Sequence, residues 1–354
     1  MTTWHGLIDS DYRRWLPVTP DTPSISLGEG NTPLLRSEHL SGLTGCEVWL
    51  KVEGANPTGS FKDRGMTVAI SRAAQAGAEA VICASTGNTS ASAAAYAARA
   101  GVTAAVLVPK GRVALGKLSQ AVRYGAEIVE IDGTFDDCLR VARELAAHHP
   151  IALVNSVGNE LRLAGQRTVA YEIVDALGQA PDLHCLPVGN GGNITATWGG
   201  YRNYREADLS GGLPRLWGFQ AAGAAPLVHG KPVADPRTAA SAINIGHPAT
   251  WEGAISARDE SGGLIAAVTD EQIFAAYRML ARRDGVFAEP ASAAGVAGLL
   301  DRHARGELEP GLRIVITLSG NGLKDLDASL RDGYTPTETS AATGDVARAL
   351  RLAA

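Results

Sequence analysis

The stretch that decides the fold runs Asn56-Pro57-Thr58-Gly59-Ser60-Phe61-Lys62-Asp63-Arg64-Gly65. It opens with turn-forming residues, and Thr58 or Ser60 is suited to cap a helix that follows. Apolar residues then recur with helical spacing over residues 61–73, and residues 48–52 upstream form a short apolar run typical of a strand. The stretch therefore predicts a turn that leads the chain from a strand into a helix.

Lys62 falls in the first turn of this predicted helix, where the helix dipole disfavours a cation. A free lysine amine has a pKa of roughly 10.4, so an amine that acts as a nucleophile needs help to stay neutral. Two interpretations are open from this residue alone. It is either a solvated lysine near a helix start or a lysine that forms a Schiff base.

The whole ten-residue run resembles the cofactor-lysine segment of the pyridoxal-phosphate enzymes of the tryptophan-synthase-β type. Among these it is most similar to the threonine synthases, which carry an N-P-T-G-S-F-K-D-R-G run. Residues 27–34 are similar to the L-x-E-G-x-T-P-L loop of the same family. The resemblance extends over about residues 25 to 330, and it implies that Lys62 binds the cofactor pyridoxal 5'-phosphate covalently.

Downstream of residue 80, apolar strand-like runs alternate with helical segments, which predicts parallel sheets covered on both faces. With the resemblance, the predicted fold is α/β of fold type II, with two three-layer α/β/α domains and mostly parallel sheets. We expect an N-terminal arm at residues 1–20 and a large cofactor-binding domain at 21–64 and 156–335. A small domain at 65–155 and a C-terminal tail at 336–354 complete the predicted organisation.

Composition narrows the possible partners and compartment. The chain has 354 residues, of which 45% are hydrophobic and 19% charged, with a net charge of −5 and no basic tracts. This argues against nucleic-acid and membrane surfaces, and no apolar run approaches the roughly 20 residues of a membrane span. The cysteines are far apart and the start shows no signal-peptide pattern, so we expect buried thiols in a cytoplasmic chain without a metal site. A homodimer is also expected.

A glycine-rich loop, Gly189-Asn190-Gly191-Gly192-Asn193, lies between a predicted strand and a predicted helix. Glycines let backbone N–H groups converge, and a helix start adds positive potential, so a phosphate suits this loop. Its spacing matches neither a dinucleotide fingerprint nor a P-loop. The alternative is a plain strand-to-helix turn. The resemblance implies that the loop holds the phosphate of the cofactor.

Ser85-Thr86-Gly87-Asn88-Thr89 follows another predicted strand and offers hydroxyl, amide and helix-start N–H groups. A helix-capping cluster is the alternative. By resemblance, Ser85, Thr86 and Thr89 bind the substrate carboxylate, and Asn88 hydrogen-bonds the phenolic oxygen of the cofactor.

Ser319 follows the last predicted strand, in a segment that reads as a glycine-rich turn on sequence alone. The resemblance implies that its hydroxyl meets the pyridine nitrogen, where threonine synthases usually have threonine. A neutral hydroxyl does not keep the pyridine protonated as a carboxylate would, which weakens the ring as an electron sink.

The phosphate of the substrate is assigned to Asn155, Ser156 and Arg162, with Lys117 assisting, because arginine with amide and hydroxyl donors suits a phosphate. An ordinary arginine near a helix start is the alternative. Residues 155–166 depart from the family pattern N-S-V-N-P-x-R-x-E-G-Q: they are one residue longer, lack the proline and carry Ala164 in place of glutamate. Asn244 stands where arginine is expected.

The favoured function is that of a threonine synthase, which converts O-phospho-L-homoserine and water to L-threonine and phosphate. In this interpretation Lys62 moves the protons at Cα and Cβ, and the released phosphate assists the addition of water. The alternatives are a related γ-elimination or γ-replacement enzyme, a threonine or serine dehydratase, and a cofactor-binding protein without turnover. A dehydrogenase would need a dinucleotide fingerprint, which the sequence does not contain.

Overall fold

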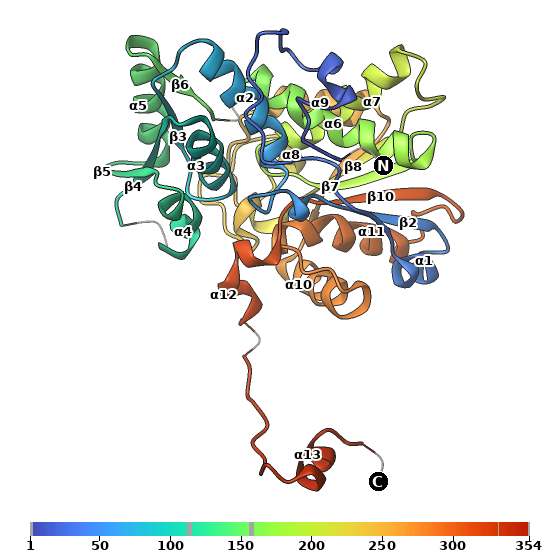
Figure 1. Cartoon of the computed structure of the whole chain (residues 1–354). Helices are drawn as coiled ribbons and strands as arrows, with labels where there is room; N and C mark the ends of the chain where they lie inside the picture. The colour runs from blue at the N-terminus through green and yellow to red at the C-terminus, as the bar shows by residue number, and fades with distance from the viewer. Residues whose placement is uncertain (1–2, 112–114, 156–158, 332, 353–354) are drawn as a thin grey trace.

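The computed structural model describes residues 3–111, 115–155, 159–331 and 333–352, and its strands form two sheets (Figure 1). The larger sheet has six strands in the order β1-β2-β10-β7-β8-β9, and only the β1–β2 pair is antiparallel. Its strands are β1 (Leu34–Arg36), β2 (Glu47–Val52), β7 (Leu183–Pro187), β8 (Arg215–Ala221), β9 (Leu264–Val268) and β10 (Arg313–Leu318).

Helices cover both faces of the larger sheet. On one face α11 contacts β7, β8, β9 and β10, and α10 packs on α11. On the other face α7 and α9 contact β8, and α6 packs on α7. The helices of this part are α1 (Glu38–Thr44), α6 (Glu160–Leu177), α7 (Gly192–Glu206), α8 (Pro226–His229), α9 (Trp251–Glu260), α10 (Asp270–Met279) and α11 (Ala294–Ala304).

The smaller sheet has four parallel strands in the order β5-β4-β3-β6. Alternate residues of β3 face opposite sides, because Val81 and Cys83 pack with α2, α3 and α4 whereas Ile82 and Ala84 pack with α5. The elements are β3 (Ala80–Ala84), β4 (Thr103–Pro109), β5 (Glu127–Ile131), β6 (Ile151–Leu153), α2 (Lys62–Gln75), α3 (Asn88–Ala100), α4 (Leu115–Arg123) and α5 (Phe135–His148).

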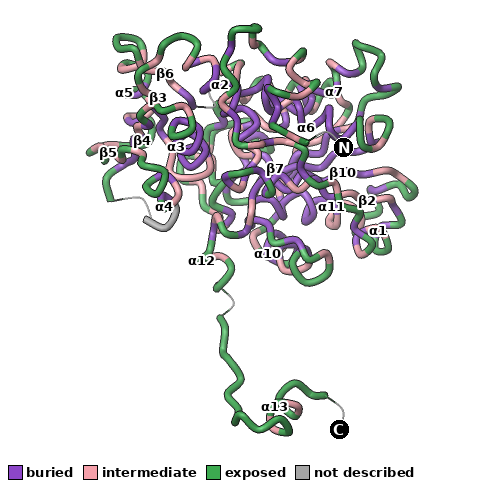
Figure 2. The backbone as a smooth tube through the Cα atoms, viewed as in Figure 1, coloured by how far each residue is buried: buried purple, intermediate pink, exposed green. Residues whose placement is uncertain are grey.

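Two three-layer units with mostly parallel sheets therefore confirm the predicted α/β fold, and Figure 2 shows the buried backbone concentrated at their centres. Helix α2 packs on both α3 and α6, so it lies between the two units. The domain boundaries drawn from the sequence stay a prediction, although all four strands of the smaller sheet fall within residues 65–155.

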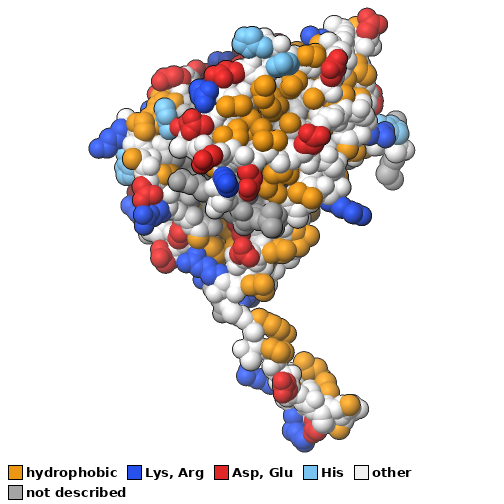
Figure 3. All heavy atoms as spheres, turned by 90° about the vertical axis from the view of Figure 1, so that its left-hand side faces the viewer, with side chains coloured by type: hydrophobic (Ala, Val, Ile, Leu, Met, Phe, Trp, Pro, Cys, Tyr) orange, Lys and Arg blue, Asp and Glu red, His pale blue; other side chains and the backbone are white. Residues whose placement is uncertain are grey.

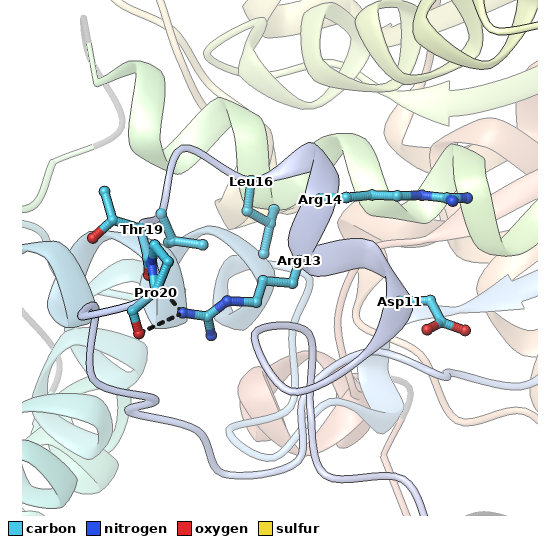
Figure 4. A pocket seen from close by; sticks show the side chains of 7 residues that line it. Asp11, Arg13, Arg14, Leu16, Thr19 and Pro20 are labelled. Carbon is cyan, nitrogen blue, oxygen red and sulfur yellow. Dashed lines mark hydrogen bonds between the residues drawn. The ribbon is translucent and has the colours of Figure 1, made fainter.

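The N-terminal arm packs on the body of the chain. Leu7, Ile8 and Leu16 are buried, and the backbone N–H of Leu7 donates to the buried Glu29 carboxylate at 3.1 Å. A surface hollow lies along the arm, where Arg13 points at the carbonyl oxygens of Thr19 and Pro20 (Figure 4). None of the predicted site residues lines this hollow.

The C-terminal end of the described chain projects away from the body as an extended tail with a short helix, α13 (Thr343–Ala349), after the short α12 (Leu326–Ser329) (Figures 1 and 3). Leu323, Leu326, Leu330 and Tyr334 lead into this tail, and each side chain is more than half exposed. No helix in the described part of the chain is long and apolar enough to span a membrane.

Most strands and helices downstream of Lys62 begin and end close to their predicted positions, but several elements were not expected. The sequence pattern does not indicate β1, α1, β9 or α9, and α9 directly follows a segment with four prolines, at residues 226, 232, 236 and 248. Helix α10 ends at Met279 and continues as a π-helical turn, Leu280–Asp284. The weakly patterned tail contains α13.

Candidate active site

The lysine segment is held against the end of β10. The backbone N–H of Phe61 donates to the Ser319 carbonyl at 3.0 Å, and that of Asn321 donates to the Gly59 carbonyl at 2.9 Å. Ser60 and Gly320 also form an isolated antiparallel bridge. These backbone contacts bring Lys62 and Ser319, which are far apart in sequence, together at the carboxyl end of β10 in the larger sheet.

Lys62 lies in the first turn of α2, as predicted, but the prediction that Thr58 or Ser60 caps this helix is wrong. Phe61 occupies the N-cap position without a side-chain cap, and the Ser60 hydroxyl has no hydrogen-bond partner in the described structure. The Thr58 hydroxyl instead donates to the buried Asp63 carboxylate at 2.6 Å, and the Thr58 N–H donates to the same group at 2.7 Å. A bonded carboxylate in the first helical turn serves the helix start in place of a cap.

A buried network of four charges anchors the same helix. The guanidinium of Arg64 donates to Glu53 (2.6 and 2.7 Å) and to Glu172 (2.7 Å), and the Lys51 amine donates to Glu172 at 2.7 Å. All four side chains are less than a tenth exposed. The two cations and two carboxylates balance, as buried charges require, and they tie α2 to β2 and to α6. Gly65 permits this approach, because a Cβ there would collide with the backbone of Arg162.

The environment of Lys62 favours a neutral amine. The pKa of Lys62 is lowered to about 7, mainly by burial and also by the positive charge of Arg162, while Glu289 partly opposes both effects. The predicted effect of the helix start has the same sign, but burial is the main cause of the shift. The Lys62 Nζ also lies 4.5 Å from the centre of the Phe61 ring.

The glycine-rich loop at residues 189–193 forms the turn between β7 and α7. Gly191 has φ of +82°, a conformation that favours glycine, and a Cβ there would lie 2.6 Å from the Thr250 carbonyl oxygen. No backbone N–H from Gly189 to Gly191 donates to another group in the described chain, and those of Gly192 and Asn193 belong to a first helical turn. The Asn193 amide nitrogen is buried without a partner among the described residues. This set of free donors fits an anion such as the cofactor phosphate.

The loop after β3 provides the start of α3. Asn88 is the first residue of this helix, and its amide nitrogen donates to the carboxylate of Glu289 at 3.1 and 3.3 Å. Ser85 and Thr86 are half-buried in the preceding turn, where the Ser85 hydroxyl accepts from the Gly87 N–H at 3.3 Å, and Thr89 is buried in the first turn. Hydroxyl groups and first-turn N–H groups thus gather beyond the end of β3.

Glu289 is a site residue that the sequence did not identify. It is only 3% exposed, and the Ser319 hydroxyl donates to it at 3.1 Å while Asn88 donates to it from the other unit. Burial raises the pKa of this carboxyl above its ordinary value, against the hydrogen bonds from Asn88 and Ser319 and the charge of Lys324. The signal in the sequence was a glutamate before Pro290, ahead of an alanine-rich helix, which a single sequence does not distinguish from a surface residue.

Of the residues expected at the substrate phosphate, one has free donors and another is bonded to the backbone. Arg162 is fully buried in the first turn of α6, and its Nη1 donates to the Val154 carbonyl at 2.5 Å. Its Nε and Nη2 have no partner among the described residues, so two charged N–H donors remain for an anion. The amide of Asn155 is bonded to the backbone of Ala84 in both directions at 2.9 Å, and it joins β6 to the end of β3.

Ser156 and the side chain of Lys117 lie outside the described residues. Asn159 caps α6 through a 3.2 Å bond from the Arg162 N–H, so the altered segment still starts the helix that carries the arginine. Asn244 is exposed after a short turn, Ser241–Ile243.

Lys324 is a second residue that the sequence did not single out. Its amine donates to the Thr58 carbonyl at 2.9 Å and to the Gln120 side chain of α4. Burial lowers its pKa, and the carboxylates of Glu289 and Asp63 oppose that effect. Lys324 therefore connects the lysine segment to the smaller unit at the edge of the site.

The described residues contain no cluster of histidine, cysteine and acidic side chains that would hold a metal ion, and the four cysteines are free and buried. A buried lysine with a lowered pKa, a glycine-rich anion loop and polar groups at the ends of β3 and β10 suit a cofactor that carries an aldehyde and a phosphate.

Comparison with known proteins gives the class first. Residues 25–320 match the family described as pyridoxal-phosphate dependent enzyme. A serine racemase from maize has the same fold, with a TM-score of 0.73 and 22% identity over 86% of this chain and 92% of the racemase. The chain is an α/β enzyme of fold type II that uses pyridoxal phosphate.

Curated relatives give the family. A threonine synthase from Mycobacterium bovis is 58% identical over 330 residues, which is 93% of this chain and 91% of the relative. A threonine synthase from Synechocystis is 56% identical over 93% of this chain and 86% of the relative. The chain belongs to the threonine synthase family.

Proposed function

We propose that this enzyme converts O-phospho-L-homoserine and water to L-threonine and phosphate, with Lys62 as the lysine that carries the cofactor. One observation supports this most directly: the chain brings an amine with a pKa lowered to about 7 to the same sheet edge as Ser319, across from Asn88. An amine whose pKa lies near the working pH is present in both forms, so its neutral form reacts with an aldehyde and accepts a proton and its protonated form returns one, which the reaction requires of one residue.

The cofactor, when bound, supplies an electron sink that acidifies the protons at Cα and Cβ of the substrate. The loop at residues 189–193 holds the cofactor phosphate through its free N–H groups, while Asn88 faces the phenolic oxygen and Ser319 the pyridine nitrogen. Ser85, Thr86 and Thr89 bind the substrate carboxylate. These assignments rest on the position of each group beyond the end of a parallel strand.

Lys62 is the base and acid of the cycle in this proposal. It takes the proton from Cα, removes a proton from Cβ as phosphate leaves from Cγ, and delivers a proton to Cγ, which becomes the methyl carbon. It returns a proton to Cα after water has added at Cβ. Arg162 holds the phosphate that leaves from Cγ through Nε and Nη2, the two donors that have no partner among the described residues. Ser156 and Lys117 complete this subsite in the proposal, and Asn155 shapes it through its two bonds to the backbone of Ala84.

The experiment follows two readouts on the purified protein reconstituted with pyridoxal phosphate. Borohydride reduction and peptide mapping should place the cofactor on Lys62, and O-phospho-L-homoserine should yield equal amounts of phosphate and threonine. A label on another lysine would contradict the assignment of Lys62 as the lysine that carries the cofactor.

Products separate the proposal from its alternatives. Phosphate without threonine, or a different amino-acid product with an added nucleophile, would favour a γ-replacement enzyme. A 2-oxo acid as the main product would favour a dehydratase. Lys62→Ala serves as the control for turnover that does not depend on the cofactor lysine.

We also propose a homodimer in the cytoplasm. Free, buried cysteines support a reducing compartment, and the exposed leucines at residues 323, 326 and 330 support a contact with a second copy. Light scattering coupled to gel filtration would give the molar mass in solution. A single-chain mass near the 36.7 kDa of the sequence would contradict the dimer.

A further inference from the structure

Glu289 lies where the two units of the chain meet, and one carboxylate joins two groups that the proposed function assigns to opposite edges of the cofactor ring. Asn88 donates to both of its oxygens, at 3.1 and 3.3 Å, from the start of α3. Ser319 donates to one of them at 3.1 Å from the end of β10. Asn88 and Ser319 thus share a buried anionic partner.

The hydrogen bonds open to Ser319 determine what Glu289 does to its hydroxyl group. A serine hydroxyl has one proton to donate and an oxygen that accepts. Two acceptors are within reach: a Glu289 oxygen at 3.1 Å and the Ser292 hydroxyl at 3.0 Å. The Ser292 oxygen already accepts from the Gly320 N–H at 3.0 Å, and an ionised carboxylate is the stronger acceptor.

We propose that Glu289 is a positioning residue that takes the hydroxyl proton of Ser319 and so turns the Ser319 oxygen into an acceptor toward the pyridine nitrogen. This inference rests on the proposed function, which places Ser319 at that nitrogen. A pyridine nitrogen that faces an acceptor is stabilised in its protonated form, whereas one that faces a donor is stabilised unprotonated. Glu289 therefore acts on the ring through the hydroxyl of Ser319. A cofactor ring that faces a neutral serine can in this way still be a strong electron sink.

The same contacts orient Asn88. One N–H group of the amide can bridge both oxygens of Glu289, which leaves the other N–H group for the phenolic oxygen of the cofactor. Exchange of the carboxylate for a group that donates would change both partners together. The ring nitrogen and the phenolic oxygen are thus coupled through one side chain.

The charges that face Glu289 set the pH range of this arrangement. Lys62 of α2 and Lys324 favour its ionised form, and Asp325 disfavours it. Burial outweighs these contacts and raises the pKa of Glu289. As the pH falls through that pKa, Glu289 becomes a donor, the Ser319 proton is released toward the ring, and protonation of the nitrogen is disfavoured.

The test uses the holoenzyme loaded with pyridoxal phosphate labelled with ¹⁵N in the ring, since the ¹⁵N chemical shift distinguishes a protonated from a bare pyridine nitrogen. At pH 8 the wild-type protein should show the protonated shift. Glu289→Gln, whose amide can donate to Ser319, should move the resonance to the bare-nitrogen position. Ser292→Ala, the matched control, should leave it where it is.

A double variant separates the relay from a general effect of the carboxylate. In a Ser319→Ala background, Glu289→Gln should cause no further shift, because the group that transmits its effect is gone. A wild-type shift in Glu289→Gln with cofactor bound, or an equal change in Ser292→Ala, would overturn the proposal.

A measurement on the wild-type protein guards against a variant that does not fold. The ¹⁵N shift and the ¹³C shift of the Glu289 carboxyl should titrate with one midpoint, and a ring signal that stays constant while Glu289 titrates would overturn the relay. Borohydride mapping on the same sample reports on the proposed function separately. A label away from Lys62 would remove that function, whereas a label on Lys62 with an unresponsive ring nitrogen would remove only the relay.

Discussion

Replacement of Arg162 tests where the substrate phosphate binds. The structure leaves Nε and Nη2 of Arg162 without partners in the described chain and uses Nη1 for the Val154 carbonyl. A phosphate that takes the two free donors gains a charge-assisted contact of about 1.5–3 kcal/mol. Each 1.4 kcal/mol corresponds to about a factor of ten, so Arg162→Met should lower kcat/KM for O-phospho-L-homoserine by about one to two decades.

The comparison ligand is L-homoserine, which lacks the phosphate. Its affinity for the holoenzyme, measured by the change in cofactor absorbance, should change little in Arg162→Met. Arg162→Lys keeps the charge but not the paired geometry, so it should lie between the wild type and Arg162→Met for the phosphorylated substrate. A thermal melt of each variant controls for the loss of the bond to Val154.

The same variants report on Lys62. The charge of Arg162 helps to hold the pKa of Lys62 down to about 7, so Arg162→Met should raise that pKa and Arg162→Lys should not. Only the neutral amine reacts with the cofactor, so the midpoint of cofactor incorporation into the apoprotein should move to higher pH in Arg162→Met alone. Equal losses for both ligands, or no loss for either, would refute the placement of the phosphate at Arg162.

Three further outcomes follow from the site and the core. Lys62→Ala should abolish turnover yet retain some cofactor through the loop at residues 189–193, as measured by equilibrium dialysis. Gly191→Ala should destabilise the protein by about 1 kcal/mol or more and weaken cofactor binding, because φ is +82° and the Cβ would contact Thr250, whereas Gly212→Ala has open space and should do neither. Burial lowers the pKa of His184 to about 3, so the unfolded chain binds a proton that the folded chain excludes as the pH falls below about 6.5. The free energy of unfolding should therefore fall as the pH is lowered. In urea titrations, His184→Gln should reduce the slope of this free energy against pH by about 1.4 kcal/mol per pH unit between pH 6 and 4. An unchanged slope would contradict a buried neutral imidazole.

The sequence predicted the fold where local signals and sheet topology agree. The alternating strands and helices of residues 80–153 appear as expected because β3, β4 and β6 are short apolar runs and the helices between the strands end within two residues of a glycine or proline. The three-residue β1 was missed because so short a run resembles a loop. The edge strand β9 was missed although its apolar run is as long as that of β3. Helix α9 was missed because its flanking prolines and glycines outweighed a weak helical pattern.

The sequence predicted the residues that contact the cofactor but not the residues that hold those side chains in place. Lys62, Asn88 and Ser319 were selected from motifs, and their common partner Glu289 was not, because its role arises only when β10 and α3 come together. Asn155 shows the opposite case. Its residue type suits a phosphate, whereas its amide is bonded to the backbone of Ala84, a contact between segments that no local pattern reveals.

The buried charges around Arg64 limit how the lysine segment can be transplanted. Arg64 is two residues from Lys62, and its carboxylate partners Glu53 and Glu172 come from an upstream loop and from α6. A graft of the ten-residue run into another scaffold would bring a guanidinium without its counter-charges into the interior, at a cost of about 3–5 kcal/mol. The smallest unit that can be exchanged between enzymes of this kind therefore includes Glu53 and Glu172, and a designer who moves the lysine must move its distant acidic partners as well.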